Sequence, residues 1–276
     1  MYQKKLNVYN VAPFVVLLIV AILAIFAPPE LNFEDKAGVY NGADIAWILV
    51  ATALVFLMTP GLAFFYGGMV HRKNVISTMI KSVVATGVVT IIWVTIGYSL
   101  CFGESIGGWI GNPTTHLFMK GISSGAPWSL APTIPLGLFA LFQLMFAIIT
   151  PALISGAIAD RTKFLSWTIF VALWVTIVYF PVAHWVFAFG NKVGDTVTGA
   201  GFLAARGVQD FAGGTAVHIN AGAAGLALAI VLGRRIGWQR TPMRPHSLPL
   251  VMLGAGLLWF GWFGFYAGSA LAANGI

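Results

Sequence analysis

The sequence predicts an all-α polytopic membrane protein, and three features of the chain indicate this class. Apolar residues fill 59% of its 276 positions and charged residues only 8%, whereas a soluble domain carries about 25% charged residues. The apolar residues gather in runs of roughly 20, the length that one helix needs to cross a bilayer. Glycine (32 residues) and tryptophan (10 residues) are abundant, as is typical of closely packed membrane helices and of membrane interfaces.

Six apolar runs are long enough to span a membrane. They lie at 45–67, 80–102, 134–159, 164–189, 215–233 and 248–271. A shorter run at 12–27 follows Lys4 and Lys5 and ends at Pro28. Its apolar core of about 14 residues has the length of a signal-peptide core. Residues 1–29 are therefore either a signal-like leader, cleaved or retained, or an extra N-terminal helix.

The basic residues orient these crossings, because Lys and Arg concentrate on the cytoplasmic side of membrane proteins. If the chain begins inside, 11 of its 15 Lys and Arg residues fall in inner segments, and seven of its eight acids fall outside, Asp160 being the exception. The basic residues are scattered over short loops, so no nucleic-acid surface is expected. Two outer loops, 103–133 and 190–214, either fold over the mouth of a pore or are loosely structured.

Two ionisable residues around the fifth crossing are candidates for function. Polar groups inside a bilayer are costly and usually face a bundle interior or a cavity. Asp210 precedes the helical run, where it is either a simple helix cap or part of a site. His218 follows eight residues later, about 12 Å deeper if the intervening residues are helical. It is either a packing residue or a donor and acceptor for a small amine.

Aromatic residues near the outer helix ends form a second group of candidates. Phe265 and Ser269 are four residues apart, hence on one helix face, and could bind a small cation with an aromatic ring and a hydroxyl. Phe102 ends the second crossing. His184 is expected to pack between helices, and Cys101 is expected to be a small buried residue. The sequence contains no spaced metal-ligand cluster, activated nucleophile or phosphate loop, so no enzyme, metal or cofactor is predicted.

These segments together resemble the ammonium transporter (Amt/Rh) family, and its bacterial-type Amt branch in particular. The most specific stretch is DFAGGTAVHINAGAAGLALAIVLGRR at 210–235. Further stretches are TPGLAFFYGGMVHRKNV (59–75), GYSLCFG (97–103), GAIADRTKF (156–164), PHSLPLVMLG (245–254) and GWFGFYAGSALAAN (261–274). The resemblance covers about 44–276, which we interpret as an ammonium transporter domain incomplete at its C-terminus.

The resemblance implies a role for each candidate. Ser269 matches the serine of an outer recruitment site with aromatic faces, and Asp210 matches the acid beside it. Phe102 and Phe265 match two stacked phenylalanines that close the pore, and His218 matches the first of two pore histidines. The tryptophan usual in the recruitment site is replaced by Phe187, whose ring binds cations less strongly.

The family fold has eleven crossings in two inverted halves, so the resemblance implies a chain truncated after the sixth conserved crossing. It also implies a homotrimer in the inner membrane, regulated by a PII-type protein through the missing C-terminus. We expect ammonium to dock outside against Phe102, Phe187 and the Ser269 hydroxyl, near Asp210. It then loses a proton before or at the constriction of Phe102 and Phe265, and ammonia passes His218 along an apolar pore. The alternatives are an ammonium sensor with a missing signalling domain and a non-conducting fragment.

Overall fold

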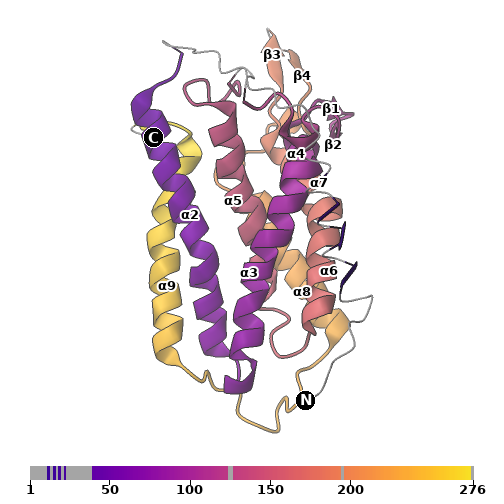
Figure 1. The fold of residues 1–276 in the computed structure, drawn as a ribbon, viewed down its shortest axis with the longest axis vertical. Coiled ribbons are helices and arrows are strands. Elements are labelled where there is room, and N and C mark those ends of the chain that lie inside the picture. Colours follow the sequence, from indigo (N-terminus) through magenta and orange to yellow (C-terminus); the bar gives the residue numbers. More distant parts are fainter. Residues whose placement is uncertain are drawn as a thin grey trace.

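The computed structural model describes residues 39–274, except 124–126 and 194–195, together with isolated helical positions between 11 and 22. Almost all of residues 1–29 lie outside the described residues, so the structure does not decide between a leader and an extra helix. The described chain is a bundle of long helices whose connections gather at its two ends (Figure 1).

Six helical segments of the described chain are long and apolar enough to cross a membrane, which confirms the six predicted crossings. They span Gly42–Met69, Arg72–Phe102, Leu136–Ile154, Phe164–Phe187, Gly214–Leu232 and Leu248–Ala270. Most boundaries lie within a few residues of the predicted ones, because hydropathy marks where apolar side chains begin and end.

The α-helices of these crossings are capped by polar residues where the sequence supplies them. They are α2 (Gly42–Met69), α3 (Val75–Ile92), α4 (Tyr98–Phe102), α5 (Leu136–Ile154), α6 (Phe164–Trp174), α7 (Phe180–Phe187), α8 (Asn220–Leu232) and α9 (Leu248–Trp262). The Asn41 side chain accepts the first N–H groups of α2, and the Ser247 hydroxyl accepts the Leu250 N–H at the start of α9. Both residue types are favoured at this position because they satisfy otherwise unpaired backbone donors.

Four of the six crossings contain a π-helical turn, which the sequence did not predict. These turns are η2 (Trp93–Gly97), η4 (Val175–Tyr179), η6 (Gly214–Ile219) and η7 (Phe263–Ala267). A π turn inserts one extra residue into a helix and is frequent at functional sites. Hydropathy does not reveal it, since the apolar composition continues through the turn.

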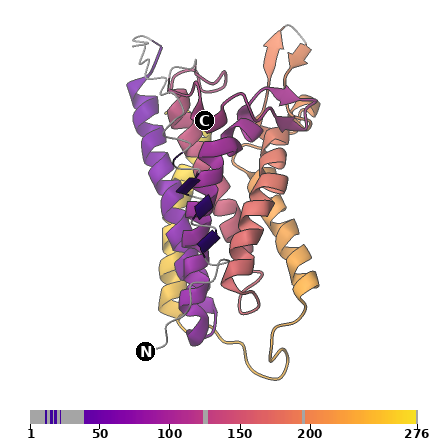
Figure 2. The same ribbon diagram turned by 45° about the vertical axis from the view of Figure 1, so that its right-hand side comes forward.

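Short elements complete the connections and add a little β-structure to the predicted all-α fold. The 3-10 turns are η1 (Arg72–Asn74), η3 (Leu117–Met119), η5 (Ala204–Arg206) and η8 (Gly268–Ala270). Strand β1 (Ser105–Ile106) pairs antiparallel with β2 (Ile110–Gly111), with Ser105 opposite Gly111. Strand β3 (Asn191–Val193) pairs antiparallel with β4 (Thr196–Thr198). Both hairpins lie at the same end of the bundle (Figure 2).

The two long outer connections pack against each other at that end. The Phe202 N–H donates to the Gly108 carbonyl at 2.7 Å, and the Trp185 indole N–H donates to the Trp109 carbonyl at 2.7 Å. The Trp109 ring stacks on Phe202 at 4.8 Å. The described parts of these connections therefore pack together at one end of the bundle, and whether they cover the mouth of a pore stays a prediction.

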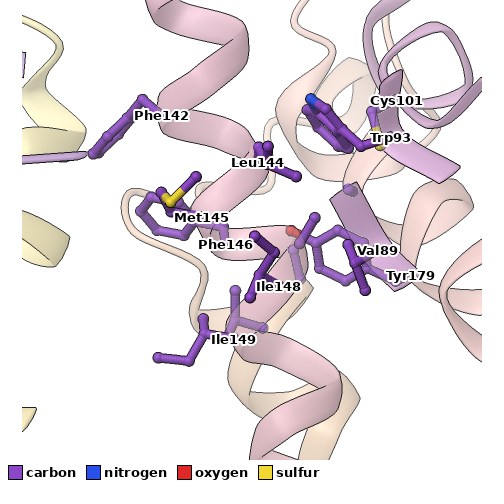
Figure 3. Close-up of a cluster of buried hydrophobic side chains, with 14 of the residues drawn as sticks. Val89, Trp93, Cys101, Phe142, Leu144, Met145, Phe146, Ile148, Ile149 and Tyr179 are labelled. Atoms are coloured by element: carbon purple, nitrogen blue, oxygen red, sulfur yellow. The ribbon is translucent and has the colours of Figure 1, made fainter. Parts of the chain in front are cut away.

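Helix α5 occupies the middle of the bundle and supplies much of its core (Figure 1). Its most apolar stretch is 78% buried, the highest share among the six candidate spans of the described chain. Phe146 and Ile148 from α5 belong to the same buried cluster as Val89 of α3 and Tyr179 of η4 (Figure 3). A helix enclosed in this way can present side chains to several neighbours, which matters for the site below.

Glycines allow α2 and α9 to approach closely. A Cβ at Gly254 would lie 2.6 Å from the Gly61 carbonyl oxygen and 2.7 Å from the Phe65 Cα. A Cβ at Gly61 would in turn lie 3.0 Å from the Leu257 Cβ. Small residues bring membrane helices into backbone contact, so the first and the last of these crossings pack as one tight pair.

At the opposite end, Asp160 ties three inner connections together. The Asn74 amide donates to one of its carboxylate oxygens at 2.6 Å, and the Arg235 guanidinium lies 3.9 Å from the other. The neighbouring Arg161 donates to the Gly233 carbonyl. The single acid predicted inside thus joins the connections that follow α2, α5 and α8.

Candidate functional site

A cavity of about 230 Å³ opens among the aromatic side chains of the outer end. It brings together all four residues predicted to bind substrate. They are Phe102, Phe187, Asp210 and Ser269. These residues come from four different crossings or their outer ends, so their meeting is a product of the tertiary fold.

Phe102 forms one wall of the cavity. Its ring meets Trp128 at 5.5 Å and Phe139 at 5.1 Å, both edge to face. It is 4% exposed, because η2 and α4 hold it against the bundle. Phe187, at the end of α7, is 8% exposed and lines the same cavity. Both phenylalanines therefore belong to the wall of a single aromatic vestibule.

Asp210 is a backbone cap as well as a cavity-lining residue. One carboxylate oxygen accepts the N–H groups of Gly213 and Gly214 at 2.6 and 2.8 Å. The other oxygen accepts those of Thr215 and Ala216 at 2.8 and 2.9 Å. A carboxylate offers about four acceptor positions, so the first turn of η6 uses its full capacity. Its negative charge remains in the cavity wall.

Ser269 lines the cavity from the end of the sixth crossing. Its hydroxyl donates to the Phe265 carbonyl at 2.8 Å, which agrees with the expectation that the two residues share a helix face. Because that bond uses the only hydroxyl hydrogen, the oxygen lone pairs can accept a hydrogen bond from a ligand.

Phe265 pairs with Phe146, a residue that the sequence analysis did not select. Their ring centroids lie 4.5 Å apart, and both side chains are almost fully buried. Phe146 also lines the cavity. The ring partners of Phe102 are different ones, as described above, so the ring pair beside the cavity is Phe146 with Phe265, tilted at 36°, and not Phe102 with Phe265.

His218 lies beyond this pair, within η6. Its imidazole contacts Phe265 at 5.7 Å and stacks on Trp262 at 5.4 Å. Its Nε2 atom is buried and has no hydrogen-bond partner within the described residues. The helical segment starts at Gly214 rather than at Asp210, so Asp210 and His218 are not joined by one continuous helix, as the sequence analysis assumed.

His184 and Cys101 have structural partners. His184 is fully buried, with Nδ1 2.7 Å from the Cys101 carbonyl and Nε2 2.8 Å from the Ser105 hydroxyl. Since Nδ1 must donate to the carbonyl, Nε2 accepts from Ser105. The Cys101 thiol is buried and directed at the Phe180 carbonyl. Both residues fit the packing roles expected of them.

The cavity also contains residues that sequence reasoning missed, chiefly Trp128, Phe139, Gln143 and Phe146. Three of them lie on α5, where Phe139 and Phe146 are seven residues apart and so share a helix face. A lone glutamine within this very apolar helix was a usable signal. Trp128 carried no such signal, because it lies in a loop.

Within the described ranges, no group of three His, Cys, Asp or Glu side chains could hold a metal ion. The arrangement instead offers an aromatic cavity, one hydroxyl acceptor, one buried carboxylate and, in contact with the Phe265 ring, a histidine whose Nε2 has no hydrogen-bond partner within the described residues. Such a site can bind a small cation that donates hydrogen bonds.

The sequence matches the model of the Ammonium Transporter Family over residues 46–276. This chain belongs to the ammonium transporter family. It is 55% identical to an ammonium transporter of Mycobacterium tuberculosis over 253 residues, which cover 87% of this chain and 52% of that protein. It is 50% identical to an ammonium transporter of Aquifex aeolicus over 254 residues, which cover 92% of this chain and 55% of the relative.

Solved structures agree with this assignment of the family. The Mep2 structure from Candida albicans superposes with a TM-score of 0.73 at 33% identity, over 85% of this chain and 50% of that one. A structure described as a sensor Amt protein superposes with a TM-score of 0.72 at 31% identity, over 84% and 56%. The chain thus spans about half the length of the curated ammonium transporters that it matches. These relatives are named as transporters and not as enzymes.

Proposed function

We propose that this chain recruits ammonium at the outer cavity and conducts ammonia past His218. The observation that carries the proposal is the cavity itself, which joins Phe102, Phe187, Asp210 and Ser269 at one end of the bundle. No Lys or Arg is among its lining residues in the described chain. Its charge and shape therefore suit a small cation.

The cavity offers ammonium two kinds of contact. Aromatic faces attract a cation through their ring quadrupoles, and the Ser269 oxygen can accept an N–H. Asp210 acts through its field, because its oxygens already accept four backbone N–H groups. Potassium has the same charge as ammonium but cannot donate hydrogen bonds, so Ser269 contributes to discrimination.

Ammonium releases a proton to water on the outer side, before or at the tilted Phe146 and Phe265 rings, and continues as ammonia. Both side chains are almost fully buried, and a bare cation pays a large desolvation penalty in such surroundings, whereas neutral ammonia does not. The His218 imidazole lies 5.7 Å from the Phe265 ring, and its Nε2 atom has no hydrogen-bond partner within the described residues. An imidazole nitrogen can guide a small amine by donating or accepting one hydrogen bond.

His218→Ala tests this proposal in the protein expressed from its complete reading frame and reconstituted in proteoliposomes. We expect selective ammonium-driven transport to be lost or its ion selectivity to change. The exposed His71 of the inner end provides a matched control as His71→Ala. Unchanged uptake and ion selectivity in the His218→Ala variant would refute the role of His218 in guiding ammonia. A wild-type protein that transports no ammonium would refute the transport function itself.

The assembly and location proposed for the protein are a homotrimer in the inner membrane. Many large apolar side chains of the crossings are exposed in the single chain. They include Ile230, Val231, Trp259 and Phe263, and lipid or further protein must cover them. Native mass spectrometry of the purified protein would report the subunit number. A PII-type protein is the proposed regulator, which co-purification with and without ammonium would test.

A second candidate function is ammonium sensing, and one comparison favours it. The structure described as a sensor Amt protein covers 84% of this chain with a TM-score of 0.72. A sensor needs the same outer cavity but not net passage of substrate. Ligand-dependent quenching of tryptophan fluorescence without uptake in proteoliposomes would favour sensing, whereas both signals together would favour transport.

A further inference from the structure

Trp128 is the cavity-lining residue whose position is least expected from the sequence. It belongs to the connection between β2 and α5, yet its side chain lines the outer cavity. Its carbonyl accepts the Ala131 N–H at 2.8 Å, which forms a turn at this point. The connection therefore carries an indole ring from the surface into the vestibule.

Two phenylalanines fix the orientation of that indole. The Trp128 ring is stacked parallel to Phe139, with centroids 5.5 Å apart and an interplanar angle of 6°. It meets Phe102 edge to face at 5.5 Å and 83°. Phe102 and Phe139 are buried and held by helices, so a ring packed against both has a defined place although its backbone lies in a loop.

Trp128 is also the one tryptophan among the lining residues of this cavity in the described chain. The other aromatic residues that line it are phenylalanines. Tryptophan binds cations more strongly than phenylalanine does, because its ring quadrupole is larger. The residue predicted to carry the recruiting ring, Phe187, provides only a phenyl group.

We propose that Trp128 is the principal cation-binding ring of the outer cavity and sets the affinity of the protein for ammonium. This inference rests on the function proposed above. A cation in the cavity contacts the indole on one side while it donates a hydrogen bond to Ser269. The outer connection then serves as part of the binding site, and Phe187 forms a secondary wall.

The test measures the KM and maximal rate of ammonium transport by the complete protein in proteoliposomes. A partly desolvated cation–π contact corresponds to a change of about 5- to 30-fold in affinity. We therefore expect Trp128→Ala to raise KM about 5- to 30-fold and Trp128→Phe to raise it roughly 2- to 5-fold. The maximal rate should stay within about twofold, because the Phe146 and Phe265 rings and His218 remain intact.

Trp109→Ala is the matched control, since Trp109 lies in the same outer loop, 103–133, in the turn between β1 and β2, but stacks on Phe202 outside this cavity. Its KM should equal that of the wild type. In the double variant Trp128→Ala and Phe187→Trp, KM should fall part of the way back to the wild-type value, because Phe187→Trp restores an indole to the cavity wall. A loop with a purely structural role would instead change protein yield and maximal rate.

The outcomes separate this inference from the function on which it rests. A wild-type protein that transports no ammonium refutes the proposed function. An active wild type with Trp128→Ala and Trp128→Phe both within twofold of the Trp109→Ala KM refutes only the role of Trp128. If Trp128→Ala is poorly folded, Trp128→Phe decides alone: a wild-type KM overturns the inference, and a raised KM at an unchanged maximal rate supports it.

Discussion

Replacing Asp210 by asparagine should lower the free energy of unfolding by more than the removal of one charge from an exposed site does. The two carboxylate oxygens accept four backbone N–H groups at 2.6 to 2.9 Å. An asparagine side chain has one acceptor oxygen and turns an NH2 group toward the remaining donors. Two of the four N–H groups would therefore lose their acceptor at the buried start of η6.

The magnitude follows from those two lost bonds. A hydrogen bond to a charged group contributes about 1.5–3 kcal/mol, so Asp210→Asn should lower the free energy of unfolding by about 3–6 kcal/mol. Water in the adjoining cavity can satisfy part of the loss, which favours the lower end of this range. A denaturant titration of the purified protein in mixed micelles measures the change.

Two further variants separate the geometry of the cap from its charge. Glu104→Gln removes the same charge from an exposed site on the same outer end, and we expect a change within about 0.5 kcal/mol. Asp210→Glu keeps the charge but moves both oxygens by one methylene, so it should be destabilising too. An Asp210→Asn variant as stable as the wild type would refute the capping argument. An Asp210→Glu variant as stable as the wild type, together with a destabilised Asp210→Asn, would also refute it, because charge and not geometry would then decide the stability.

Two further predictions concern the packing of the bundle. Gly254→Ala should destabilise the protein by about 2 kcal/mol or more, because the new Cβ would meet the backbone of α2. A Cβ at Gly256 in the same helix meets nothing within 4 Å, so Gly256→Ala should be neutral or stabilising. Thermal melting in detergent compares the two variants. His184→Ala should cost about 1–3 kcal/mol, since the buried Cys101 carbonyl loses the imidazole donor. The Ser105 hydroxyl keeps its bonds to Ala200 and Gly108. The exposed His71→Ala should melt like the wild type, and equal melting of both variants would contradict the prediction.

The crossings were predictable because hydropathy alone decides them. Each apolar run is long enough to span a bilayer, and the structure places helices at all six. Asp210 and His218 were also accessible from sequence, since ionisable residues at a membrane helix are costly and therefore informative. Several residues of the outer cavity were predicted individually, but their spacing in the sequence does not show that their side chains line one cavity.

The errors come from details that only tertiary packing decides. Phe146 was missed because α5 carries several phenylalanines at helical spacing, and the sequence does not say which one faces Phe265. The π turns escaped prediction since they leave hydropathy unchanged. They also rotate the faces of the crossings, so a helical wheel with a constant period of 3.6 residues misplaces residues beyond them.

Asp210 and His218 are linked through the backbone of residues 213–218. The carboxylate fixes the N–H groups of residues 213–216, and the Gly213 carbonyl accepts the N–H groups of both Val217 and His218. Any shift of the cap must therefore move the backbone that orients the imidazole against the rings of Trp262 and Phe265. A merely structural cap should leave selectivity intact in the fraction that folds. Because these bonds are contiguous, Asp210 variants should instead alter the ion selectivity of the folded fraction, which makes Asp210 a positioning residue for His218.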